Sequence, residues 1–176
     1  SIIVPVYNER DNILKLLSSI TEVMEGAALI YEIIMIDDGS TDDTIAQLIA
    51  LKPEFEKMRI VQFRRNFGQT AAMAAGFDFA RGEVIVPMDG DLQNDPADIP
   101  RMIDKLNEGF DVVSGWRKYR KDKLFSRKIP SWLANWIIGK ITGVRLHDYG
   151  CSLKVYRKEV LQYVNLYGEM HRFIPA

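Results

Sequence analysis

Short apolar runs alternate with amphipathic stretches from the first residue of the chain to about residue 115. The apolar runs are rich in isoleucine and valine, a pattern typical of strands buried in a sheet. We therefore predict strands at Ser1–Val6, Tyr31–Ile36, Arg59–Phe63, Glu83–Met88 and Phe110–Ser114.

Helices are predicted between these strands. The first is expected from Asn12 onward, because apolar residues then recur on one helical face at Ile13, Leu16, Leu17, Ile20 and Val23. The others are expected from a capping box at Ser40-Thr41-Asp42-Asp43 to about Leu51, over the alanine-rich Gln69–Ala80, and from Asp95-Pro96, where a cap residue precedes proline.

Strands that alternate with helices predict an α/β protein with a Rossmann-like, mostly parallel sheet and helices on both faces. The length of 176 residues fits a single domain with one core. Ligands of such sheets bind at the carboxyl ends of the strands. We therefore expect the ligand-binding and catalytic residues at those ends.

Composition narrows the classes of protein. A formal net charge of −1 disfavours a general polyanion binder, and the lone Cys151 excludes an internal disulfide. No apolar stretch approaches the roughly 20 residues of a membrane span. Since the chain starts inside a strand and stops at Ala176 without a closing signal, we expect a domain of a longer protein.

Acidic residues follow the predicted strands. Asp37-Asp38-Gly39-Ser40 comes after the second strand and Asp89-Gly90-Asp91 after the fourth. Two carboxylates one residue apart can face one hard cation such as Mg²⁺, which binds few carboxylates together with substrate phosphates. A solvated turn is the alternative for Asp89-Gly90-Asp91. Asp37-Asp38 favours the cation, because adjacent like charges are costly without a cation or donors nearby.

The same motifs carry a family resemblance. Val4–Glu9, Asp37–Ser40 and Asp89–Asp91 together resemble family 2 glycosyltransferases of the GT-A fold. Arg65–Gln69, Asp89–Gln93 and Asp148–Cys151 resemble the subgroup that loads sugars onto polyprenyl phosphates, which includes dolichyl-phosphate mannose synthases and bacterial undecaprenyl-phosphate glycosyltransferases. The run Gly150–Lys154 is more similar to the bacterial undecaprenyl branch. The resemblance covers essentially the whole chain.

The resemblance implies specific roles. Mg²⁺ or Mn²⁺ would be held by Asp89, Asp91 and Gln93. The nucleotide-sugar donor would contact Pro5, Tyr7, Asn8, Glu9, Asp37, Asp38, Gly68, Gln69, Asp89, Gly90 and Lys154, with Asp37 accepting a base N–H that uracil and guanine both offer. The acceptor phosphate would be bound by Arg117, Arg127 and Ser131. Catalysis would rest on Asp89, Asp91, Asp148 and Arg117.

A basic stretch in the second half of the chain concerns the location of the protein in the cell. Residues 117–128 hold seven basic residues against one acid and precede the aromatic, partly apolar Ile129–Ile141. With the resemblance, this indicates an anionic membrane surface rather than a solvated loop and a docked helix. We expect residues 1–176 to be one GT-A catalytic domain at the cytoplasmic face of a membrane, truncated before C-terminal membrane helices. Nucleic acid is disfavoured as a partner, and homo-oligomerisation stays open.

The predicted reaction is the inverting transfer of a sugar from a UDP- or GDP-sugar to a polyprenyl phosphate. One rival is a family 2 glycosyltransferase with a sugar or lipid hydroxyl acceptor, for which Asp148 would be the general base. A Mg²⁺-dependent phosphotransferase of the haloacid dehalogenase kind is a weaker rival, since those enzymes place their acidic pair after the first strand. A binding-only module is disfavoured by the intact acidic motif.

Overall fold

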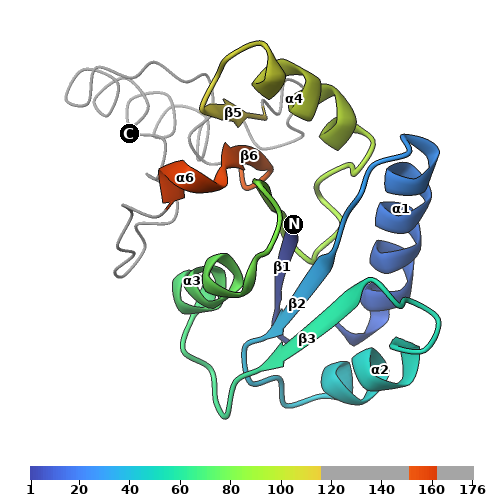
Figure 1. The fold of residues 1–176 in the computed structure, drawn as a ribbon. Helices are drawn as coiled ribbons and strands as arrows, with labels where there is room; N and C mark the ends of the chain where they lie inside the picture. Colours follow the sequence, from blue (N-terminus) through green and yellow to red (C-terminus); the bar gives the residue numbers. More distant parts are fainter. Residues whose placement is uncertain (116–150, 162–176) are drawn as a thin grey trace, which may run out of the picture.

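The computed structural model describes residues 1–115 and 151–161. The described chain forms one six-stranded sheet in the order β3-β2-β1-β4-β6-β5 (Figure 1). The strands are β1 (Ile2–Val6), β2 (Ile33–Asp37), β3 (Met58–Gln62), β4 (Val84–Pro87), β5 (Val112–Ser114) and β6 (Lys154–Arg157). Strands β1 to β4 pair in parallel, whereas β6 runs antiparallel to both β4 and β5. The sheet is mixed and mostly parallel, as the alternation predicts.

Helices cover both faces of this sheet. They are α1 (Ile13–Gly26), α2 (Thr44–Leu51), α3 (Gln69–Phe79), α4 (Asp98–Asn107) and α6 (Lys158–Leu161), with a short 3-10 helix η1 (Arg10–Asn12). Figure 1 shows α1 and α2 on one side of the sheet and α3 on the other. The described residues contain no helix long and apolar enough to cross a membrane.

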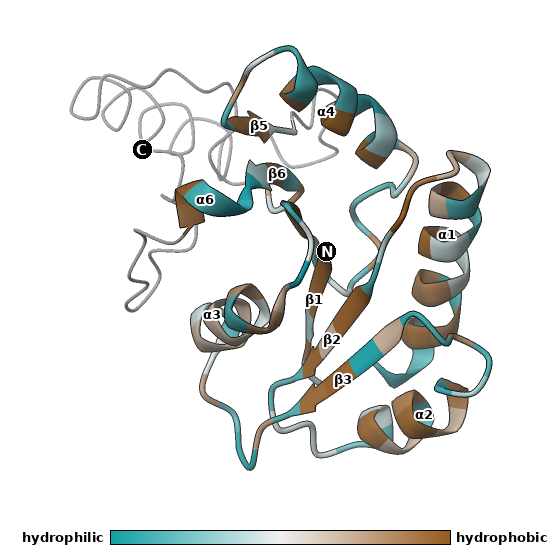
Figure 2. Ribbon diagram, in the orientation of Figure 1, coloured by the Kyte–Doolittle hydropathy of each residue, from teal (hydrophilic) through white to brown (hydrophobic). Residues whose placement is uncertain are grey.

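Alternation along β1 divides the interior into two cores. Ile2, Val4 and Val6 face the core shared with α1, α2 and α4, and Ile3 faces the core shared with α3. Figure 2 shows the hydrophobic character of β1 and β2 that this burial on both faces requires. Gly76 lets α3 approach closely, because a Cβ there would lie 2.2 Å from Cγ2 of Ile3.

Most predicted elements are confirmed within a few residues, but two helix starts are wrong. The helix α2 begins only at Thr44. The Ser40 hydroxyl does not cap this helix and instead accepts the N–H of Asn8 at 2.9 Å. The helix α4 begins at Asp98, after a turn in which Asp95 Oδ1 accepts the N–H of Ala97 at 3.0 Å. In both motifs the polar side chain accepts a hydrogen bond from a backbone amide of a loop or turn, so the helix begins a few residues later.

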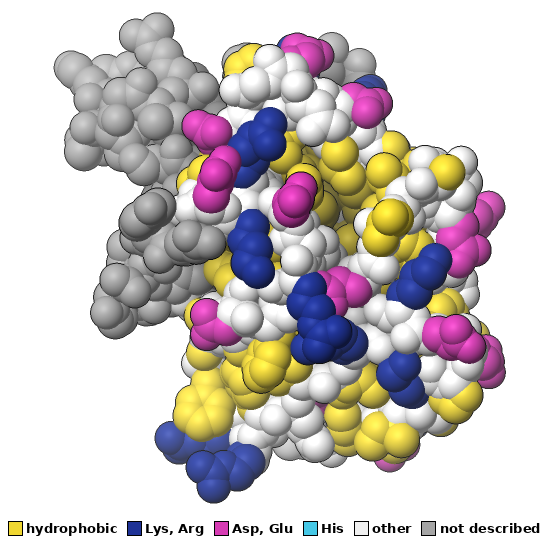
Figure 3. All heavy atoms as spheres, in the orientation of Figure 1, with side chains coloured by type: hydrophobic (Ala, Val, Ile, Leu, Met, Phe, Trp, Pro, Cys, Tyr) yellow, Lys and Arg dark blue, Asp and Glu magenta, His cyan; other side chains and the backbone are white. Residues whose placement is uncertain are grey.

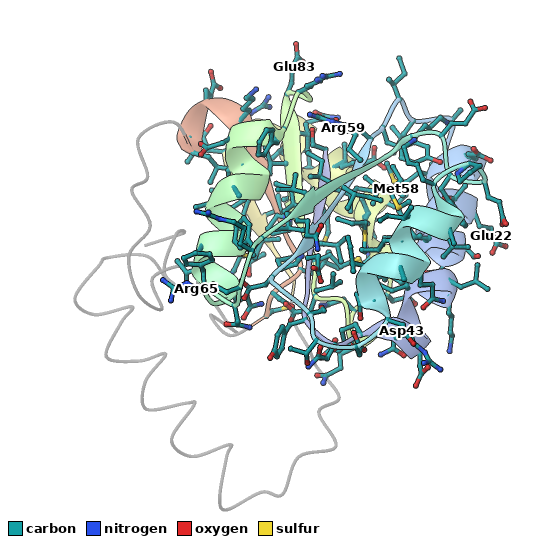
Figure 4. All side chains as sticks on the ribbon, turned by 90° about the horizontal axis from the view of Figure 1, so that it is seen from below. Glu22, Asp43, Met58, Arg59, Arg65 and Glu83 are labelled. Atoms are coloured by element: carbon teal, nitrogen blue, oxygen red, sulfur yellow. The ribbon has the colours of Figure 1, made fainter. Side chains whose placement is uncertain are left out.

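A partly buried ion pair between Glu32 and Arg59 lies at the amino-terminal ends of β2 and β3. Glu32 accepts hydrogen bonds from the Ser1 hydroxyl at 2.7 Å, the N–H of Arg81 at 2.7 Å and the Arg59 guanidinium at 2.9 Å. Burial by itself would raise the pKa of Glu32, but these hydrogen bonds outweigh it and lower the pKa from 4.5 to about 2. Figure 4 shows Arg59 at the end of the molecule away from Asp43.

Glu32→Gln is expected to lower the free energy of unfolding at pH 7 by about 1.5–3 kcal/mol, as for hydrogen bonds to a charged group. Because the folded pKa lies below the ordinary value, this stabilisation is complete above pH 4.5 and lost as the pH falls towards 2. Urea unfolding of both proteins between pH 7 and pH 2.5 measures it. The control is Glu83→Gln, because Glu83 is exposed, and this variant should change the free energy of unfolding little. If the difference in unfolding free energy between the original chain and Glu32→Gln stays constant down to pH 2.5, the pKa of Glu32 is not lowered by these hydrogen bonds.

Candidate active site

A cavity of about 380 Å³ opens at the carboxyl ends of β1, β2 and β4, where the sequence predicts a ligand site. Its walls come from the loops that follow the first four strands and from the start of α3. The lining residues are Pro5, Val6, Tyr7, Glu9, Asp38, Asn66, Gly68, Gln69, Asp89, Gly90 and Asp91. Tyr7 is 44% exposed, so an aromatic face is available at the mouth.

The adjacent carboxylates after β2 are stabilised by backbone amides. Asp38 accepts the N–H of Phe67 at 2.7 Å on one oxygen and the N–H of Gly68 at 2.9 Å on the other. Asp37 accepts the N–H of Ser40 on Oδ1 at 3.2 Å. The protein therefore provides donors for three of the four carboxylate oxygens of this pair, and Asp38 ties the end of β2 to the loop before α3.

Asp37 is completely buried, and its Oδ2 has no hydrogen-bond partner in the described part of the chain. An unsatisfied buried carboxylate oxygen is costly. A donor brought by a ligand would relieve that cost, and the predicted base N–H would be such a donor. Asp37 itself is not among the residues that line the cavity.

Asn8 joins two loops at the rim. Its backbone has a φ of 56°, a region that asparagine tolerates better than most residues. Its Oδ1 accepts the N–H groups of Thr41 at 2.8 Å and Asp42 at 3.3 Å. Asn8 thus fixes the loop after β1 against the loop after β2, and its side chain faces that loop rather than the cavity.

The acidic loop after β4 is held by specific hydrogen bonds. The Gln69 side-chain amide donates to Asp89 Oδ1 at 2.7 Å, and the N–H of Gln93 donates to Asp91 Oδ1 at 3.0 Å. Gly90 between them is buried against β1, since a Cβ there would lie 2.8 Å from Cγ1 of Val6. A larger residue between the two acids would force the Val6 side chain or the loop to move.

Asp89 and Asp91 each keep one carboxylate oxygen that a divalent cation could bind. The second oxygen of Asp89 and of Asp91 accepts no hydrogen bond within the described residues. No cluster of three or more histidine, cysteine, aspartate or glutamate side chains occurs there either. A hard cation at this loop would thus take its remaining ligands from phosphate oxygens and water, the coordination typical of Mg²⁺.

The structure brings together most of the predicted donor-site residues. Pro5, Tyr7, Glu9, Asp38, Gly68, Gln69, Asp89, Gly90 and Asp91 line one cavity. The cavity lining does not include Asn8, Asp37, Gln93 or Lys154. Lys154 is buried at the start of β6, opposite Ser114. The predicted roles of Arg117, Arg127, Ser131 and Asp148 lie outside the described residues.

Val6 and Asn66 line the cavity but were not predicted as site residues, and a contact of Asn94 beside it was not predicted either. Asn66 lines the cavity, although it belongs to the run Arg65–Gln69 that carries the resemblance. Asn94 donates from Nδ2 to the Ser152 hydroxyl at 2.8 Å, which connects the acidic loop to the segment before β6. The sequence gives no signal for this contact, because its partners are 58 residues apart.

Comparison with known proteins identifies the family. Residues 1–164 match the family described as glycosyl transferase family 2, so the chain belongs to that family. Its α/β sheet is the GT-A fold. The chain superimposes on glucosyl-3-phosphoglycerate synthase from Mycobacterium tuberculosis with a TM-score of 0.70, at 22% identity, covering 93% of this chain and 58% of that one.

A second solved structure has a similar fold. It is a mannosyltransferase from Pyrobaculum calidifontis in complex with GDP-Man and Mn²⁺, which superimposes with a TM-score of 0.69 at 21% identity and covers 95% of this chain and 46% of that one. At this identity the likeness concerns the fold alone.

Curated relatives are more similar in sequence. A dodecaprenyl-phosphate galacturonate synthase of Rhizobium johnstonii is 54% identical over 178 residues, covering 100% of this chain and 53% of that protein. An undecaprenyl-phosphate 4-deoxy-4-formamido-L-arabinose transferase of Aeromonas hydrophila is 41% identical over 177 residues, covering 99% of this chain and 54% of that protein. The chain spans about half the length of these relatives.

Proposed function

We propose that the chain is the catalytic domain of an inverting glycosyltransferase that moves a sugar from a UDP- or GDP-sugar to a polyprenyl phosphate. The observation that carries the proposal is the 54% identity, over the whole chain, to a dodecaprenyl-phosphate galacturonate synthase. The cavity at the strand ends supports it independently, because its acidic loop and aromatic rim suit a nucleoside diphosphate.

The donor would bind across the cavity. The nucleobase would stack near Tyr7 and donate a hydrogen bond towards the unsatisfied Oδ2 of Asp37. The diphosphate would lie at Asp89 and Asp91. A bound Mg²⁺ or Mn²⁺ would supply charge neutralisation for the leaving diphosphate. Gln69 fixes one oxygen of Asp89 and so orients the carboxylate before the donor arrives.

The acceptor needs little activation. A phosphate monoester is largely ionised at neutral pH, with a second pKa of about 6. Its oxygen would attack the anomeric carbon in line, the bond from that carbon to the diphosphate would break, and the configuration would invert. Catalysis would then depend on positioning and charge compensation rather than on a general base.

The acceptor side of the proposal concerns residues outside the described part. Arg117, Arg127 and Ser131 would bind the acceptor phosphate, since a guanidinium fork matches phosphate geometry. A lipid acceptor would place the catalytic domain against the cytoplasmic face of a membrane. The basic residues 117–128 supply a charge that anionic lipids attract.

The test compares Arg127→Ala with Asp148→Asn in the full-length protein, at saturating donor and with a short polyprenyl phosphate. Arg127→Ala should be the poorer enzyme, chiefly through a higher KM for the acceptor, whereas Asp148→Asn should retain measurable turnover. Loss of a required general base removes a factor of about 10²–10⁴ in rate. If Asp148→Asn is inactive and Arg127→Ala is nearly normal, the acceptor is a hydroxyl group and the proposal of a lipid phosphate is wrong.

A further inference from the structure

The loop between β3 and α3 exposes an aromatic ring beside two arginines. Phe67 is 53% exposed, and Arg64 and Arg65 are also exposed. The Phe67 ring is fixed from two sides: its centroid lies 5.6 Å from that of Phe63 in an edge-on arrangement, and the Arg65 guanidinium lies 4.8 Å from the ring centroid. The ring is held at the surface instead of being buried.

The loop is attached to the wall of the cavity. The N–H of Phe67 is bound by Asp38, and Asn66 and Gly68 on either side of Phe67 line the cavity itself. Figure 4 shows Arg65 at the periphery beside the start of α3. Figure 3 shows lysine or arginine side chains beside hydrophobic ones at the lower end of the drawn face, where Figure 1 places this loop. The aromatic and basic surface therefore borders the mouth of the site.

The charge of this loop is uncompensated within the described residues. Arg10, Arg59 and Arg101 each form an ion pair with a carboxylate at 3.0 Å or less. Neither Arg64 nor Arg65 forms such a pair with a described residue. Because no described carboxylate neutralises either guanidinium group, both complement a surface of negative charge.

We propose that Arg64, Arg65 and Phe67 form a membrane-contact surface that docks the mouth of the cavity on an anionic bilayer. An aromatic ring flanked by arginines suits the headgroup region, where the ring enters the apolar boundary and the guanidinium groups meet lipid phosphates. The choice of a bilayer rests on the proposed function, because a lipid acceptor has to reach this cavity from a membrane. Its residues are distinct in sequence from the basic residues 117–128.

The experiment is co-sedimentation of the 176-residue chain with vesicles of phosphatidylcholine, with and without phosphatidylglycerol, at low salt. The double variant Arg64→Gln/Arg65→Gln should bind anionic vesicles about 10- to 30-fold more weakly, at about five-fold per charge. Phe67→Ala should weaken binding by on the order of five- to ten-fold. Binding of the double variant should also depend less on salt.

Matched controls remove the same chemistry elsewhere. Phe79→Ala removes a ring that is 48% exposed at the other end of α3, and Lys15→Gln/Arg81→Gln removes two exposed charges that form no ion pair with a described residue. Both controls should bind vesicles like the original chain. Equal losses in controls and test variants, or no loss in the test variants, would overturn the proposal. Thermal unfolding of every variant separates a local effect from loss of the fold.

One further outcome tests whether the surface contacts a bilayer or a second copy of the chain. Another separates failure of this proposal from failure of the proposed function. A change of oligomeric state in the loop variants, with unchanged vesicle binding, would make the surface a contact between copies and overturn the proposal. Transfer to a soluble short-chain polyprenyl phosphate in detergent tests the acceptor without a bilayer. If that transfer fails while Phe67→Ala still weakens vesicle binding, the membrane surface stands and the lipid-phosphate acceptor does not.

Discussion

Asp91→Asn is expected to abolish the dependence of nucleotide binding on a divalent cation. The amide keeps the size of the side chain but removes the charge that would hold the metal, and Asp91 is exposed at a loop, so the fold should survive. Binding of UDP or GDP in the presence of Mn²⁺ should weaken by about 10- to 100-fold, which corresponds to about 1.5–3 kcal/mol. Isothermal titration calorimetry with and without Mn²⁺ measures both effects.

Asp95→Asn provides the matched control, because Asp95 is an exposed acid on the same loop and its Oδ1 only accepts the N–H of Ala97. An asparagine can make the same hydrogen bond, so binding should keep its dependence on Mn²⁺. Metal-dependent binding of normal strength in Asp91→Asn would show that the cation is held elsewhere.

Gly39→Ala should be the most destabilising single substitution near the site. Gly39 has a φ of 69°, and a Cβ there would lie 2.3 Å from the carbonyl carbon of Arg65 and 2.7 Å from the nitrogen of Asn66. The obstacle is backbone, so the loop has to move. Strain and overlap together should lower the free energy of unfolding by about 2–5 kcal/mol, measured by urea unfolding.

Gly109→Ala separates the two causes. Gly109 also has a positive φ, of 109°, but a Cβ there would meet no atom within 4 Å. It should therefore cost only the backbone strain. Gly39→Ala should additionally weaken nucleotide binding, because the displaced loop carries Asn66 in the cavity wall. Equal effects of the two substitutions on stability and binding would show that the loops separate easily.

Local sequence was sufficient to predict β1 to β5, α1 and α3 within a few residues, and α2 and α4 apart from their starts, because each segment carries its own apolar or capping pattern. The element β6 was not predicted. Its four residues, Lys154–Arg157, include two charged side chains, and it forms only because β4 and β5 provide edges on both sides. Strand pairing of this kind depends on contacts distant in sequence, so a local pattern does not reveal it.

The candidate site was predicted in outline because parallel strands bring their carboxyl ends to one edge. Sequence could not assign the partner of each acid. Asp38 was expected to need either a cation or hydrogen-bond donors, and its partners are the amides of Phe67 and Gly68, 29 and 30 residues away. The link between Gln69 and Asp89 spans 20 residues and depends on the packing of α3 on the sheet. Such hydrogen bonds are set by the tertiary fold.

The antiparallel strand β6 also constrains the order in which the chain can fold. Strands β1 to β4 pair with one another in parallel and can associate as soon as residue 87 has been synthesised. Strand β5 comes next in the chain but pairs with β6, where Ser114 lies opposite Lys154. Until β6 arrives, β4 presents an open hydrogen-bonding edge and β5 has no strand partner within the described residues. Completion of the sheet is thus a late, long-range step, of the kind that slows folding and leaves an edge exposed to aggregation.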